Sequence, residues 1–191
     1  ECRLGEGDGA WTNRETFGVN VVGRKPPFRM PVVMWGLYSP DGVANNLTTL
    51  TDIGFTHCLG LRCDYQRIWE EGAPVPAVTD AELEKSRRML DDALVNDLGI
   101  VISLGVGRWL ADKPEYLRVN RSGEPYEREN LCCNFPELAP FAENVGASVA
   151  QTYGEFPAFT AALINTEVRD GTQLCFHEHD RALYRADTGS E

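Results

Sequence analysis

The sequence lacks a long hydrophobic run and is poor in positive charge. No apolar stretch approaches the roughly 18–20 residues of a membrane-spanning helix, so we expect no membrane span. The 191 residues carry 18 Lys and Arg against 29 Asp and Glu, a formal net charge of −11. Nucleic acids and anionic membrane surfaces are negatively charged themselves, so this balance argues against both as partners.

Cysteine is also scarce: six in 191 residues are too few for a disulfide scaffold, and no two have C-x-x-C spacing. Cys175, His177 and His179 alternate along the chain, so in an extended segment all three would face one way and could bind zinc. The residues that follow, 181–185, favour a helix, which would move the two histidines apart. We therefore predict no metal and no cofactor.

From about residue 31, short apolar runs alternate with stretches of helical periodicity. The runs at residues 31–38, 55–61, 100–106 and 159–165 predict four strands, and the stretches at 43–53, 79–98 and 134–153 predict three helices. Each helix is expected to close at a glycine: Gly54, Gly99 or Gly154. Residues 79–82 fit a capping box, and Asn134 is the expected N-cap of the third helix.

Strict alternation predicts an α/β fold with a parallel sheet. An open doubly wound sheet is one possibility, but the first strand-to-helix turn, residues 39–42, has no glycine-rich phosphate loop. The long connections, residues 62–78 and 107–134, both follow strand ends, where a (β/α)8 barrel builds its binding face. We predict that residues 31–191 form a parallel (β/α) half-barrel of about four βα units. Residues 1–30 are expected to be an extension from a preceding β domain.

Functional residues of such a barrel lie where its strands end. These positions hold Tyr38; Arg62 and Asp64; Arg108 and Trp109; and Asn165, Glu167, Arg169 and Asp170. Glu167 is the candidate catalytic residue because a carboxyl group can protonate a leaving group. Asn165, Trp109, Tyr38, Arg62, Arg169 and Asp170 are the candidate substrate-binding residues. Polar residues also mark where a strand simply meets solvent, and aromatic residues at strand ends are often there for packing.

A series of motifs follows in order along the chain: Gly107-Arg108-Trp109, residues 113–117, Ser122-Gly123, residues 131–134, Tyr153-Gly154 and residues 164–167. This order resembles the retaining (β/α)8 glycoside hydrolases of clan A, and among them the family 42 β-galactosidases. Two positions depart from the family pattern. Thr166 separates Asn165 from Glu167, and Leu59 stands where the family usually has arginine.

The resemblance implies hydrolysis of an oligo- or polysaccharide by double displacement. Glu167 would act as acid and then base, while a second carboxylate about 5–5.5 Å away forms the glycosyl–enzyme intermediate. In this superfamily that nucleophile lies on the seventh strand, so we expect this chain alone to be inactive. A further segment, a partner chain or a second copy would complete the barrel.

Two alternatives remain open at this point. One is a metal-dependent hydrolase on a similar barrel that uses Asp64, His177 and His179. The other is a non-catalytic, carbohydrate-binding half-barrel, which the inserted Thr166 keeps in consideration.

Overall fold

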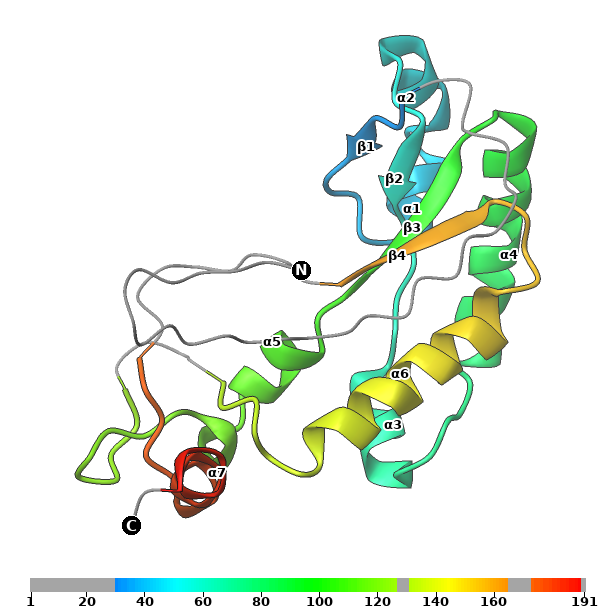
Figure 1. Ribbon diagram of the computed structural model, residues 1–191. Helices are drawn as coiled ribbons and strands as arrows, with labels where there is room; N and C mark the ends of the chain where they lie inside the picture. Colours follow the sequence, from blue (N-terminus) through cyan, green and yellow to red (C-terminus); the bar gives the residue numbers. More distant parts are fainter. Residues whose placement is uncertain (1–29, 127–130, 165–172, 190–191) are drawn as a thin grey trace. The chain divides into compact units, whose positions relative to one another are not determined.

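The computed structural model describes residues 30–126, 131–164 and 173–189 (Figure 1). The chain divides into two compact units, residues 1–30 and 31–191, and the elements below belong to the second. Four strands form one sheet in which all neighbours are parallel: β1 (Val33–Met34), β2 (His57–Leu59), β3 (Gly99–Leu104) and β4 (Phe159–Ile164). Their spatial order follows the chain, and the predicted α/β class is confirmed.

The described residues form seven α-helices, where the sequence predicted three. They are α1 (Pro40–Ala44), α2 (Leu47–Ile53), α3 (Tyr65–Glu71), α4 (Asp80–Val95), α5 (Val106–Ala111), α6 (Leu138–Tyr153) and α7 (Glu178–Thr188). A 3-10 turn, η1 (Pro114–Tyr116), follows α5. Among these helices, none combines the length and the apolar character needed to cross a bilayer.

Two of the additional helices, α3 and α5, lie in connections that were predicted as loops. The helix expected at residues 43–53 is two helices, because Ser39 accepts a hydrogen bond from the Gly42 amide and starts α1 early, and the chain breaks again before Leu47. The first strand is shorter than predicted because Gly36 and Leu37 adopt positive φ angles of 151° and 59°, which end the extended conformation.

Some predicted helix ends are confirmed and others are wrong. The capping box of α4 is present, with Thr79 and Glu82 bonding each other's backbone amides, and Gly54 closes α2 in the left-handed conformation. Gly99 does not end α4, since Asn96 does so and Gly99 opens β3. Asn134 does not cap α6, which starts after Glu137; its side chain bonds Asp180 instead.

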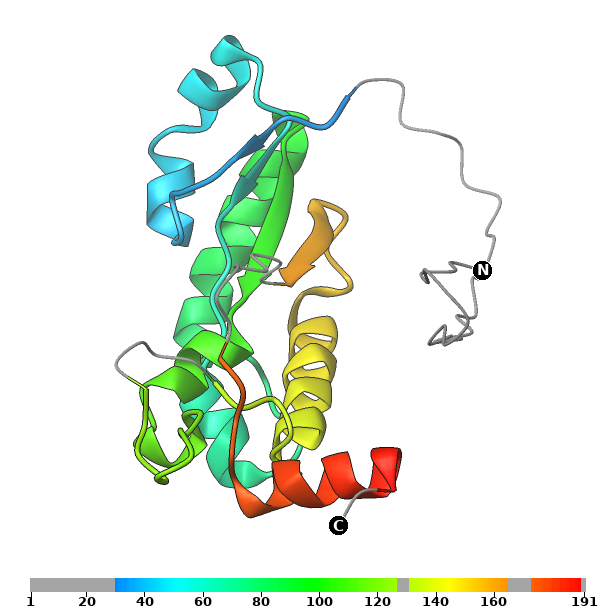
Figure 2. The same ribbon diagram turned by 60° about the vertical axis from the view of Figure 1, so that its left-hand side comes forward.

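The main hydrophobic core lies against one face of the sheet. Ile100 and Ile102 of β3 and Cys58 of β2 are fully buried there, and because side chains alternate along a strand they share a face. Buried residues from four helices, α1, α2, α4 and α6, belong to this same cluster. Figures 1 and 2 show α4 running alongside β3, with α6 next to it.

The opposite face of the sheet carries a separate row of residues. The strand registers align Leu59 with Val101 and Val101 with Ala161, so these three side chains lie side by side across β2, β3 and β4. Leu59 and Val101 are buried, yet neither belongs to the helix-covered cluster. The four helices thus cover one face only.

A second, aromatic cluster packs α3, α5 and α6 together beyond the ends of the strands. Trp69, Trp109 and Phe141 pack with ring centroids 4.9–5.7 Å apart, around the buried residues Ile68 and Val145. This cluster fixes the start of the long connection that follows β3.

Candidate functional site

The predicted acid/base segment falls outside the described residues. Asn165, Glu167, Arg169 and Asp170 all follow the last residue of β4, Ile164, within residues 165–172.

The structure brings two other predicted residues together. The Arg62 Nε donates a hydrogen bond of 3.4 Å to the backbone carbonyl of Tyr38, so the segments that follow β1 and β2 meet at this point. Both side chains are exposed, Tyr38 to 54%. The Arg62 carbonyl in turn accepts a 2.9 Å hydrogen bond from the hydroxyl of buried Tyr153.

Trp109 and Asp64 have structural partners. The Trp109 ring is partly buried, lies 5.2 Å from the Phe141 ring, and has the Lys113 ammonium 4.5 Å from its centroid. Asp64 caps α3 by accepting a 3.1 Å hydrogen bond from the Arg67 amide. Neither residue belongs to the group of metal-ligand side chains described next.

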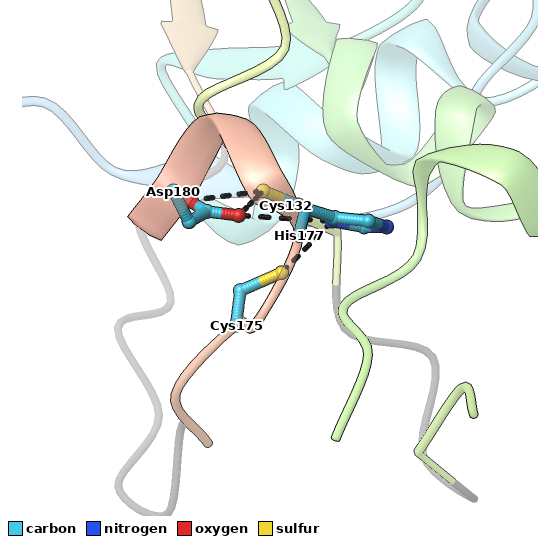
Figure 3. A group of neighbouring side chains, drawn as sticks. All are labelled: Cys132, Cys175, His177 and Asp180. Carbon is cyan, nitrogen blue, oxygen red and sulfur yellow. Dashed lines mark hydrogen bonds and ion pairs between the residues drawn. The ribbon is translucent and has the colours of Figure 1, made fainter. Parts of the chain in front are cut away.

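Four side chains converge where the residues after α5 meet the start of α7 (Figure 3). Cys132, Cys175, His177 and Asp180 each direct one ligand atom into this group, and these atoms all lie within 4.8 Å of one another. Cys132 is buried and the other three are partly buried. We call this group the Cys2HisAsp centre.

Local structure explains why three of the four ligands face one point. Residues 173–177 approach α7 in a non-helical conformation, and Phe176 pairs its amide with the Val119 carbonyl. His177 is the N-cap of α7, with an extended ψ of 153°, and Asp180 lies in the first turn. The turn into the helix therefore places the two side chains together, with His177 Nδ1 3.6 Å from Asp180 Oδ2.

The centre is held together by hydrogen bonds even without an ion. The Cys132 thiol donates to Asp180 Oδ2 at 3.2 Å, Cys175 Sγ lies 3.0 Å from His177 Nδ1, and Asn134 donates to Asp180 Oδ1 at 2.5 Å. Burial, together with the neighbouring Asp180 and Cys175, raises the pKa of Cys132 to about 12, although a hydrogen bond with the Asn134 backbone acts to lower it. Burial also acts to raise the pKa of Asp180, but hydrogen bonds from Asn134, Cys175 and Cys132 outweigh it and hold that pKa below its usual value.

His179 lies beside the centre. Its Nε2 is 3.5 Å from Cys132 Sγ and 3.3 Å from Asp180 Oδ2, and its ring stacks on that of His177 with centroids 5.0 Å apart. The expectation that a helix would separate the two histidines is wrong, because His177 precedes the helix and both rings pack around Phe135.

The sequence pattern located only part of this centre. Cys175 and His177 were recognised by their alternation, whereas Cys132 and Asp180 were not. Cys132 lies more than 40 residues before the other three ligands. Its contact with them forms only because the chain after β4 comes back to the segment that carries Cys132. Asp180 was detectable in principle, since Cys175, His177 and Asp180 form a C-x-H-x-x-D pattern.

Two thiols, an imidazole and a carboxylate are a ligand set that suits Zn²⁺. Zinc takes four such ligands in tetrahedral sites, with bonds of roughly 2.0–2.3 Å, so a modest contraction of the group would bring all four into range. A site with four protein ligands has no open position for water, which is typical of structural zinc and not of catalytic zinc.

Comparison with known proteins adds no relative: no protein-family model, no curated protein and no solved structure matches this chain.

Proposed function

We propose that residues 31–191 are the first half of a (β/α)8 glycoside hydrolase barrel, with Glu167 as the acid/base residue. The observation that carries this proposal is the arrangement of the sheet: four parallel strands in chain order, with four helices, α1, α2, α4 and α6, packed on one face. In a barrel, consecutive strands are neighbours in the sheet and the helices cover its outer face only. In a doubly wound sheet, the strand order reverses once and helices cover both faces.

The other face of the sheet also fits this proposal. The row formed by Leu59, Val101 and Ala161 corresponds to a layer of side chains in a barrel interior. Most residues of the edge strand β4 are exposed, and Ile164 is 72% exposed. This exposure is expected of a strand that pairs with a further strand in the complete barrel. A further segment, a partner chain or a second copy would supply the remaining strands.

The residues at the strand ends would have separate roles in this barrel. Glu167 would protonate the glycosidic oxygen and then take a proton from water, while a carboxylate outside residues 31–191 acts as the nucleophile. The exposed pair of Tyr38 and Arg62 would contact the sugar, because both come from strand ends and neither side chain is buried.

Hydrolysis assays test this proposal. The 191-residue chain is assayed on aryl β-galactosides by itself and in an assembly that completes the barrel, whether a longer polypeptide or a partner chain, with Glu167→Gln and the exposed Glu155→Gln as matched variants. We expect no turnover by the chain alone. In the completed barrel, Glu167→Gln should lower kcat by roughly 10²–10⁴-fold, and Glu155→Gln should leave it unchanged. Full activity in Glu167→Gln, or turnover by the isolated chain, would contradict the proposal.

A second function is favoured by the Cys2HisAsp centre: binding of one zinc ion that fastens residues 131–134 to the start of α7. A bound ion would replace the present hydrogen bonds with metal bonds and displace the thiol protons, so its affinity should rise with pH. The role is structural, because the four ligands fill a tetrahedral shell.

Metal analysis of untagged protein tests the zinc site. We expect about one zinc per chain, and a thiolate-to-metal charge-transfer band when cobalt replaces it. Cys132→Ser should lose the metal, while Cys133→Ser should keep it, since the neighbouring Cys133 is exposed and outside the centre. Equal zinc content in the two variants would exclude this site.

A further inference from the structure

A large open pocket lies directly beside the Cys2HisAsp centre. Its volume is about 1080 Å³, and residues 118–121 and 132–134 form one side while residues 174–176 and α7 form the other. The pocket is unusual for this chain because four arginines line it: Arg118, Arg121, Arg181 and Arg185. The whole chain carries a net charge of −11, so this is a local concentration of positive charge on an acidic protein.

Most of this positive charge is not neutralised by described acidic residues. Arg181 pairs with Glu178 at 3.0 Å, whereas Arg118 donates to neutral carbonyls, those of Leu131 at 3.0 Å and Gln173 at 2.6 Å. Arg121 and Arg185 make no ion pair with a described residue, and both side chains are exposed. A zinc ion on two thiolates and a carboxylate would carry one negative charge, which leaves the pocket positive.

Aromatic and apolar groups line the same pocket. The Arg121 guanidinium lies 5.4 Å from the centroid of the Phe176 ring, and Tyr184 on α7 is 65% exposed. Leu174, also in the pocket, is 76% exposed. Guanidinium groups bind carboxylates and sulfates through paired hydrogen bonds, and aromatic faces offer a flat surface for the C–H groups of a sugar ring.

We propose that this pocket binds an acidic saccharide, one whose sugars carry carboxylate or sulfate groups. The choice of a sugar as the ligand rests on the proposed glycosidase function. The arginines of the pocket indicate that this sugar is negatively charged. A long polyanion such as a nucleic acid is disfavoured, because beyond the pocket it would meet an acidic surface. An uncharged saccharide would leave the guanidinium groups without a partner.

The inference is tested by calorimetric titration of the complete chain in zinc-containing buffer. The probes are a trimer of galacturonic acid, the neutral galactose trimer and inorganic sulfate. We expect the acidic trimer to bind at least tenfold more tightly than either, and its affinity to fall as NaCl is raised. Arg121→Gln and Arg185→Gln should each weaken binding by about tenfold, whereas Arg88→Gln on α4 should not change it.

Each other outcome overturns the inference. Equal binding of the acidic and neutral trimers would show that charge is not recognised. Sulfate binding as tight as that of the trimer would show a simple anion site, and no binding of any probe would show no site. Unchanged zinc content and circular dichroism establish that the variants fold. Glu167 is not needed for binding to this pocket. The binding results are therefore independent of the hydrolysis assay that tests the glycosidase proposal.

Discussion

At the scale of single residues, Tyr153 joins the helical layer to a strand end. Its side chain is fully buried near the end of α6, and its hydroxyl donates a 2.9 Å hydrogen bond to the carbonyl of Arg62, just after β2. Arg62 also contacts Tyr38, so one hydroxyl supports the place where two strand ends meet.

Removing that hydroxyl should lower the stability of the fold. Tyr153→Phe leaves the Arg62 carbonyl without its donor, and we expect the free energy of unfolding to fall by about 1–3 kcal/mol in urea denaturation. Tyr184→Phe, at an exposed position of α7, serves as the control and should change stability little. Equal stability of the two variants would show that the hydrogen bond contributes nothing.

Buried titratable groups predict a loss of stability at alkaline pH. Burial raises the pKa of Cys58 from 9.0 to about 11 and that of Tyr153 from 10.0 to about 12. Between pH 9 and 12 the unfolded chain therefore loses protons that the folded chain keeps, so the free energy of unfolding should decrease with pH. Denaturation at fixed pH values measures this, and Cys58→Ala should show a smaller decrease between pH 9 and 11. The same slope in both proteins would contradict the assignment to Cys58.

At the scale of elements, hydrophobic periodicity predicted the position of all four described strands and of the two long helices α4 and α6. Phe141, Val145 and Val149 of α6 are buried as their spacing indicates, as are Ile100 and Ile102 of β3. Leu94 of α4 follows buried Leu90 by four residues but is 50% exposed, because the buried face of the helix ends near Ala93, close to the Asn96 cap.

The remaining elements depend on contacts distant in sequence. The helices α3 and α5 are seven residues or fewer, too short for a periodic pattern, and they are stabilised by the aromatic cluster around Trp69 and Trp109. The Cys2HisAsp centre depends in the same way on where the chain returns after β4. Sequence patterns report local conformational preferences, so they do not predict contacts between residues that are distant in the sequence.

Two glycines test how tightly the elements pack. A Cβ at Gly60, which follows β2, would lie 2.8 Å from Val43 Cγ2 of α1, whereas a Cβ at Gly146 of α6 would meet nothing within 4 Å. We expect Gly60→Ala to destabilise the protein by about 1–3 kcal/mol through overpacking. Gly146→Ala should stabilise it by up to about 1 kcal/mol, because alanine favours the helix. Thermal unfolding compares the two, and shifts in the same direction would show that the α1–β2 contact is looser than described.

At the scale of the whole molecule, the sheet of the described unit has two uncovered edges. The strands β1 and β4 each pair with one neighbour only, and in β4 three consecutive residues, Thr160 to Ala162, are exposed. Such an edge offers free backbone hydrogen-bonding groups to another chain.

This edge predicts self-association of the isolated chain. We expect its sedimentation coefficient to rise with protein concentration, and Ile164→Lys to weaken that dependence by placing a charge at the exposed end of β4. Val95→Lys, at an exposed position on α4, is the matched control. A monomer at all concentrations would mean that the edge is already protected.

The Cys2HisAsp centre has one more consequence for the segment that carries Glu167. That segment is bounded on one side by Ile164, at the end of a paired strand, and on the other by Cys175, one of the converging thiols. A metal ion on that thiol would anchor the second boundary, as pairing with β3 anchors the first. Peroxide, which attacks thiols, would then release the anchor at Cys175 and leave the one at Ile164 in place; under the proposed function, oxidation of a residue other than Glu167 would therefore lower turnover.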